Sequence, residues 1–232
     1  MEPLRILMVA TSHEELGATG RKTGLWLEGF AAPYYVFMEA GAIVTMASVE
    51  GGMPPIDPAS LGEETGPATH RFRTDPAAQT ILNHTMEISH ARAEEFHGVF
   101  YAGGHGPMWD LATDRSSSYL LSAFAEQGKC IGAVCHAPAA LLQVSVNGIS
   151  FLEGRTVTAF SNEEEEALGL VDEMPFLLED VLKASGAVYR KGRAFEPFVA
   201  VDRRLVTGQN PASSKPAALA FLDDIRKRAV FD

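Results

Sequence analysis

A cysteine followed directly by a histidine, Cys135-His136, stands where an apolar run ends and a helix-forming run begins. Ala133 and Ala137 flank the cysteine, as small residues flank the nucleophile in the tight strand-to-helix turn G-x-S-x-G. Such a turn places the sulfur at the end of a sheet, above a helix N-terminus that lowers the thiol pKa. We therefore predict that Cys135 is a nucleophile with a depressed pKa and that His136 is its acid or base. The alternative is a small buried apolar cysteine, the role expected of Cys130 inside the strand.

The positions of the histidines restrict the kind of cysteine enzyme. None of the seven histidines follows His136, whereas papain-like proteases and glutamine amidotransferases need a catalytic histidine far downstream of the cysteine. Neither chemistry is expected here. The base must be His136, a carboxylate or a histidine earlier in the chain.

Composition excludes several classes of protein. The 232 residues include 19 Lys+Arg and 30 Asp+Glu, a formal net charge of −11, so nucleic acid and anionic membranes are unsuitable partners. No apolar run approaches the roughly 20 residues that cross a bilayer, and the N-terminus lacks a signal-peptide pattern. Two cysteines provide neither a disulfide framework nor a zinc ligand set. We expect a cytoplasmic enzyme or ligand-binding protein.

Short apolar runs rich in β-branched residues alternate with amphipathic stretches. This order is typical of a doubly wound parallel α/β sheet, which binds ligands at the carboxyl ends of its strands. Strands are expected at 6–10, 43–47, 99–102, 130–134, 156–160 and 187–189, with a small hairpin formed by 198–201 and 205–207. Helices are expected at 24–40, within 77–97, and at 117–127, 136–142, 174–185 and 214–229. The stretch 51–73, rich in Pro and Gly, is expected to be a surface excursion serving as a lid or dimer contact.

Several segments together resemble one known family. Residues 133–138, Ala-Val-Cys-His-Ala-Pro, look like the nucleophile motif of the ThiJ/PfpI superfamily, in the subgroup of glutathione-independent glyoxalases and heat-shock chaperones. Matching segments occur in order along almost the whole chain, at 22–28, 33–35, 101–110 and 205–214. The resemblance implies one flavodoxin-like domain over residues 1–232, with helices on both faces of the sheet. It also implies a homodimer that needs no cofactor and no metal.

The resemblance also implies a Cys-His-acid triad. Matching onward from the segment Glu153-Gly154-Arg155-Thr156-Val157-Thr158 places the acid at Glu165, beside His136 and the Cys135 nucleophile. Because Glu165 lies in a run of four glutamates, the register can slip by one, and the run can also be a solvated helix N-terminus. The turn after residues 101–102 makes Gly104 and His105 walls of the pocket, and the Gly104 N–H is expected to bind an oxyanion.

One position departs from the superfamily pattern. Members usually have a buried glutamate on the first helix, four residues before a proline, which serves the glyoxalases as general base. Counting back from Pro33 gives Gly29, and Glu28 is its neighbour. Either Glu28 supplies the base or the site lacks one, so glyoxalase turnover is expected to be weak.

The function that follows is conversion of a small 2-oxoaldehyde such as methylglyoxal to a 2-hydroxy acid, without metal or glutathione. Cys135 would attack the aldehyde carbon, His136 would move protons and Glu165 would orient His136. Two alternatives from other classes remain open. The protein can be a stress-response holdase chaperone, or a redox sensor in which Cys135 is oxidised without turnover.

Overall fold

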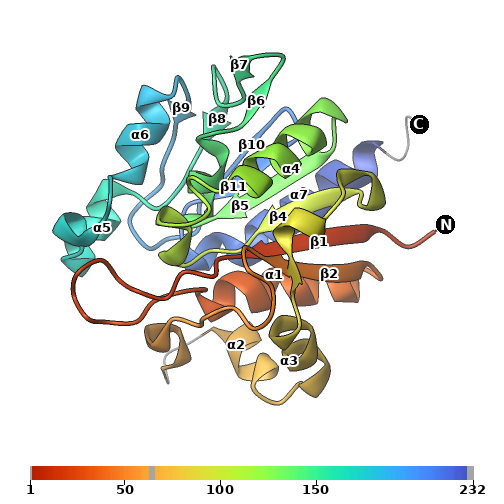
Figure 1. The fold of residues 1–232 in the computed structure, drawn as a ribbon, viewed down its shortest axis with the longest axis horizontal. Coiled ribbons are helices and arrows are strands. Elements are labelled where there is room, and N and C mark those ends of the chain that lie inside the picture. Colours follow the sequence, from red (N-terminus) through yellow and green to blue (C-terminus); the bar gives the residue numbers. More distant parts are fainter. Residues whose placement is uncertain (1, 63–65, 229–232) are drawn as a thin grey trace.

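The computed structural model describes residues 2–62 and 66–228. Its centre is a seven-stranded sheet in the order β10-β11-β5-β4-β1-β2-β3 (Figure 1). All neighbouring strands pair in parallel except β10, which pairs antiparallel with β11 as a C-terminal hairpin. The strands are β1 Arg5–Ala10, β2 Ile43–Ser48, β3 Met86–Glu87, β4 Gly98–Tyr101, β5 Cys130–Val134, β10 Val199–Asp202 and β11 Leu205–Gly208. The expected doubly wound parallel sheet with a small hairpin is thereby confirmed.

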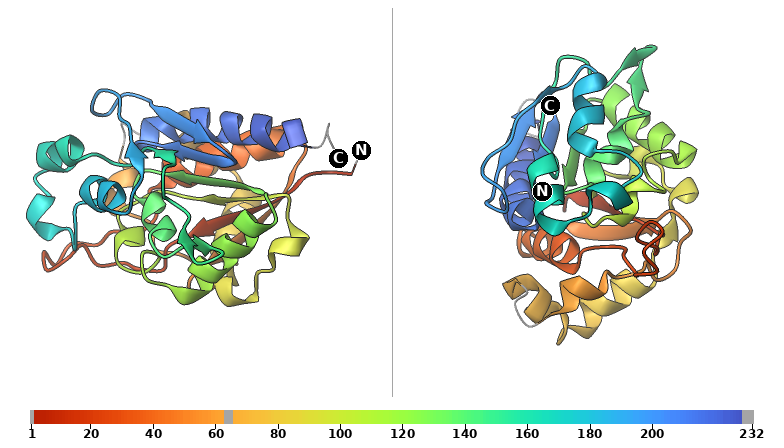
Figure 2. Two further views of the ribbon diagram at one scale, coloured as in Figure 1. Left: turned by 90° about the horizontal axis from the view of Figure 1, so that it is seen from above. Right: turned by 90° about the vertical axis from the view of Figure 1, so that its left-hand side faces the viewer.

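Alternate residues of the strands enter two separate apolar cores. In β1, Ile6 and Met8 face the core formed with α1 (Leu27–Glu39), α2 (Pro67–Phe72), α3 (Pro76–Asn83) and α7 (Ser214–Arg228). Leu7 and Val9 face the opposite core, which includes α4 (Arg115–Glu126) and α6 (Leu178–Ala184). Because both faces of the sheet are covered, β1 is apolar and buried from Ile6 to Ala10, and β5 is buried along its whole length. Figure 2 shows α1 and α7 on one side of the sheet and α4 on the other.

Two of the expected strands lie outside the central sheet. Residues 156–160 and 187–189 contribute only β8 (Thr156–Val157) and β9 (Val188–Tyr189), which pair in a small parallel sheet of their own. A second small sheet joins β6 (Ser145–Val146) to β7 (Ile149–Ser150). Short apolar runs do not show which partner a strand will find, since pairing depends on the tertiary arrangement.

The expectations for the helices and for the stretch 51–73 need four corrections. The segment after the elbow is a 3₁₀ turn, Ala137–Leu141, and not an α-helix over 136–142. The part of 77–97 beyond α3 contains a short strand and two 3₁₀ turns. The stretch 51–73 is only partly a surface excursion, because its α2 buries Thr69 and Phe72. The glutamate run forms the start of α5 (Asn162–Leu168), which none of the expected helices included.

Within the described part of the chain, no helix is both long enough and apolar enough to span a bilayer.

Candidate active site

Cys135 occupies a strained turn at the carboxyl end of β5. Its φ is 60°, in the left-handed region that a residue with a side chain rarely adopts. The turn is fixed on both sides, because the Cys135 N–H donates to Gly208 O at 2.9 Å and its carbonyl accepts from the Phe160 N–H at 3.0 Å. A Cβ atom on Gly103 would lie 2.7 Å from the Cys135 Cβ, so the neighbouring loop must have glycine there. Backbone strain from a left-handed conformation at a non-glycine residue is found most often at functional sites.

His136 links the sulfur to a carboxylate. Its Nδ1 lies 3.2 Å from the Cys135 Sγ, and its Nε2 forms a close hydrogen bond with Glu165 Oε1. The His136 side chain is fully buried, and the Phe160 ring lies over it with the ring centroids 4.5 Å apart. Because an ionised carboxylate only accepts hydrogen bonds, we assign the His136 proton to Nε2. This tautomer leaves Nδ1 as the acceptor for the Cys135 S–H.

The N-terminal cap of α5 fixes which of the four consecutive glutamates are buried. Ser161 caps α5 in a capping box with Glu164, whose Oε2 accepts from the Ser161 N–H. Glu164 and Glu165 are buried, whereas Glu163 and Glu166 are exposed. The pattern Ser-x-x-Glu is a capping-box signature. It would have identified Glu164 as the capping residue and so placed Glu165 one position after the cap.

The charge state of Glu165 follows from its partners. Burial alone would raise its pKa, but the two histidines beside it, His136 and His105, lower the pKa to about 2. Glu165 is therefore a carboxylate at neutral pH, which suits it to hold His136 in one orientation.

The thiol and the imidazole are both neutral at rest. Burial raises the pKa of Cys135 well above its ordinary value, and Glu164 and Glu165 raise it further, against the lowering effect of the Gly104 and His136 N–H groups. Burial also lowers the pKa of His136. The expected depressed thiol pKa is therefore wrong for this resting state. Cys135 is 4% exposed, and only a short 3₁₀ turn follows it in place of the expected α-helix.

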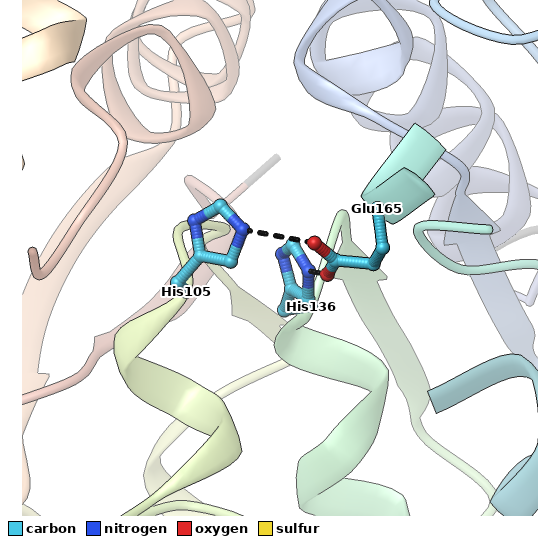
Figure 3. Close-up of side chains that lie close together, drawn as sticks. All are labelled: His105, His136 and Glu165. Carbon is cyan, nitrogen blue, oxygen red and sulfur yellow. Dashed lines mark hydrogen bonds and ion pairs between the residues drawn. The ribbon is translucent and has the colours of Figure 1, made fainter. Parts of the chain in front are cut away.

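Gly104 and His105 lie where the loop after β4 meets the elbow. The Gly104 N–H lies close enough to the Cys135 sulfur to lower the thiol pKa, against the effect of burial. Gly104 has a φ of 125°, and a Cβ there would lie 2.1 Å from Gly24 O, so this approach requires glycine. The His105 ring lies beside the His136 ring, with the centroids 4.2 Å apart, and its Nε2 lies 3.5 Å from Glu165 Oε2 (Figure 3).

The fold does not bring the Glu28 carboxylate to Cys135, His136 and Glu165. Its Oε2 accepts hydrogen bonds from the Thr69 N–H at 2.8 Å and from the Thr69 hydroxyl at 2.7 Å. Gly29 is the residue that faces the elbow, since a Cβ added there would lie 3.2 Å from Gly103 N. A side chain at position 29 would therefore extend toward the loop that contacts Cys135, whereas the Glu28 carboxylate joins α1 to α2.

A cleft of about 460 Å³ opens beside the first turns of α1. Trp26, Glu28, Pro211 and Lys215 are among its lining residues, and Cys135 is not. The Trp26 N–H donates to Gly103 O at 2.9 Å, so the wall of the cleft is attached to the loop that covers the sulfur. Cys130, by contrast, is buried at the far end of β5, where burial and the nearby Asp224 raise its pKa.

Sequence reasoning missed two residues that organise the site. Phe160 covers His136, and no pattern marked it. Glu164 joins three segments: besides the cap, its Oε1 accepts from the Phe195 N–H and from the Asn210 side-chain amide, each at 2.8 Å. The fold and this site define a class of α/β protein with a cysteine in the tight turn at the end of a central strand.

The chain belongs to the DJ-1/PfpI family, whose model matches residues 27–224. It is 30% identical to the protein named glutathione-independent glyoxalase hsp3102 of Schizosaccharomyces pombe, over 92% of this chain and 94% of that one. It is 25% identical to Glyoxalase 3 of Candida albicans, over 93% and 95% of the two chains.

Solved structures with the same fold include Rapid Encystment Protein 24 KDa of Francisella tularensis. That structure has a TM-score of 0.90 and 35% sequence identity, and covers 96% of this chain and 99% of its own. Glyoxalase III of Candida albicans has a TM-score of 0.88 at 24% identity, covering 95% and 96% of the two chains, and supports the fold alone.

Proposed function

We propose that this protein is a glutathione-independent glyoxalase that converts small 2-oxoaldehydes, such as methylglyoxal, to 2-hydroxy acids. The observation that carries the proposal is the unbroken line from the Cys135 sulfur through His136 to the buried Glu165 carboxylate. The names of the full-length relatives support the same activity.

The first half of the reaction needs a nucleophile and a general base. As the sulfur attacks the aldehyde carbon, His136 Nδ1 accepts the thiol proton and passes it to the aldehyde oxygen, which gives a hemithioacetal. Glu165 stabilises the imidazolium that forms in between. Because both partners are neutral at rest, the proton moves only when a substrate is present. The Gly104 N–H, which points at the sulfur, is placed to stabilise negative charge developing beside it.

The second half moves hydrogen between two adjacent carbons. The C–H proton of the hemithioacetal carbon is removed, and a proton is returned to the neighbouring ketone carbon through an enediol, which leaves a 2-hydroxyacyl thioester. One carbon is thereby oxidised and its neighbour reduced, so no external oxidant is needed. Water then cleaves the thioester to the 2-hydroxy acid and regenerates the thiol.

The chain has no carboxylate at the position that faces the elbow, because that position is Gly29. A well-placed base contributes about 10²–10⁴-fold to such a step. We therefore expect slow turnover, limited by the carbon-to-carbon proton transfer.

The redox-sensor alternative receives less support. Oxidation of a cysteine depends on thiolate character and exposure, whereas Cys135 is buried with a raised pKa.

The experiment is release of 2-hydroxy acid from methylglyoxal without glutathione. Wild-type protein and Cys130→Ser should form lactate, and Cys135→Ser should not. Lactate formation by Cys135→Ser at the wild-type rate, or none by the wild type at any enzyme concentration, would contradict the proposal.

A further inference from the structure

We propose that His105, His136 and Glu165 form a binding site for a divalent transition-metal ion of the zinc type. The three side chains come from separate parts of the chain: the loop after β4, the elbow after β5 and the first turn of α5. Figure 3 shows both imidazole rings directed at the same carboxylate.

The spacing of the polar atoms suits a metal ion. One ligand atom from each residue lies within 4.8 Å of the others, and His105 Nε2 lies 3.5 Å from Glu165 Oε2. Two ligands that are each about 2.0–2.1 Å from a zinc ion in tetrahedral geometry lie about 3.4 Å apart. The carboxylate and the two rings therefore need only small side-chain rotations to share one ion.

Two atoms of the cluster have unused hydrogen-bonding capacity. His105 Nε2 and Glu165 Oε2 are both buried without a hydrogen-bond partner. The side chains themselves are 8% and 4% exposed. Buried polar atoms without partners are uncommon in folded proteins and destabilise them. A cation between these two atoms would satisfy both at once.

The donor types select the class of metal. Two imidazole nitrogens and one carboxylate oxygen form the same ligand set as catalytic zinc sites. Magnesium and calcium prefer sites made of oxygen atoms, so imidazole-rich clusters discriminate against them. We expect Zn²⁺ and Co²⁺ to bind, and Mg²⁺ not to bind.

Metal binding has a specific consequence for His136. To ligate the ion, Nε2 must release its proton, and the remaining ring proton then sits on Nδ1, facing the Cys135 sulfur 3.2 Å away. A metal-bound histidine usually donates its other N–H to an acceptor in this way. In that state neither ring nitrogen can accept a proton. The ion would therefore inhibit glyoxalase turnover. This inhibition rests on the proposed function, whereas metal binding itself does not.

The test measures binding of the metal alone to the full chain after treatment with a chelator. Titration with Zn²⁺ should show one ion per chain, and Co²⁺ should give the visible absorption of a site with nitrogen and oxygen ligands. His105→Asn and Glu165→Gln should each weaken Zn²⁺ binding at least tenfold, and His90→Asn, at an exposed histidine outside the cluster, should not. Circular dichroism checks that each variant is folded.

A thiol site is the main competing explanation, and Cys135→Ser separates the two. The proposal expects this variant to keep its Zn²⁺ affinity within about tenfold, since sulfur is not a ligand. Loss of binding in Cys135→Ser would overturn the proposal, as would unchanged binding in both His105→Asn and Glu165→Gln. Absence of a one-to-one complex in the wild type would also overturn it. None of these results depends on turnover, so a failed glyoxalase assay leaves the conclusion about metal binding intact.

Discussion

Cys135 and His136 are neighbours in the chain, and the Cys135 sulfur lies 3.2 Å from His136 Nδ1. Neighbouring side chains of a strand point to opposite faces of the sheet. The left-handed backbone of Cys135 ends this alternation where β5 stops, which allows the two side chains to meet. The chemistry of the site therefore depends on one strained residue.

The pH dependence of Cys135 alkylation tests the neutral resting pair. Because a thiol with a raised pKa forms thiolate only at higher pH, we expect the midpoint of the rate in chelator-treated Cys130→Ser protein to lie above the ordinary value of about 8.5. The same protein unfolded in denaturant should show the ordinary midpoint. A midpoint below 8.5 in the folded protein would indicate a thiolate–imidazolium pair instead.

The role of Glu165 is tested by Glu165→Gln. The amide fills the same space but cannot stabilise a protonated His136, so we expect lactate formation to fall by about 10²–10⁴-fold with the fold retained. Glu163→Gln and Glu166→Gln are matched controls at exposed positions in the same turn, and should remain near the wild-type rate. If one of the exposed positions is the sensitive one, Glu165 does not orient His136.

Restoring a carboxylate at position 29 should raise turnover. The Cβ of Gly29→Glu would lie 3.2 Å from Gly103 N, which requires a shift of a few tenths of an ångström. We expect a gain of about tenfold or more in kcat with methylglyoxal, because a base would then face the elbow. Glu28→Gln is the comparison variant and should change kcat little, since the Glu28 carboxylate is bound to Thr69. An unchanged Gly29→Glu together with an inactive Glu28→Gln would assign the base to Glu28.

The strain at Cys135 should be measurable as stability. Cys135→Ala and Cys135→Gly both remove the sulfur, but only alanine keeps a Cβ in the left-handed conformation. Since that conformation costs an L-residue about 1–2 kcal/mol, Cys135→Gly should have the larger free energy of unfolding by about 1 kcal/mol. Denaturant titration of the two variants gives the difference, and a more stable alanine variant would show that the turn is not strained.

The sequence by itself determined the architecture and the tight turn at Cys135. Continuous apolar runs, such as Ile6–Ala10 in β1 and Cys130–Val134 in β5, predicted a parallel sheet covered on both faces, because strands buried on both sides have such runs. The small residues Ala133 and Ala137 around Cys135 predicted the tight turn, since such a turn leaves little room for side chains. Both the apolar runs and the turn at Cys135 depend on residues adjacent in the chain, so they can be predicted without the tertiary structure.

The tertiary structure decided the state of the site. The thiol pKa rises and does not fall because burial outweighs the nearby N–H donors, and burial cannot be read from the residues next to Cys135. Likewise, the position of Glu28 depends on Thr69 in a helix distant in sequence. The contact of His105 with Glu165 depends on a loop and a helix that only the fold brings together. Electrostatic interactions depend on distance in space, so residues remote in sequence set the protonation state of this site.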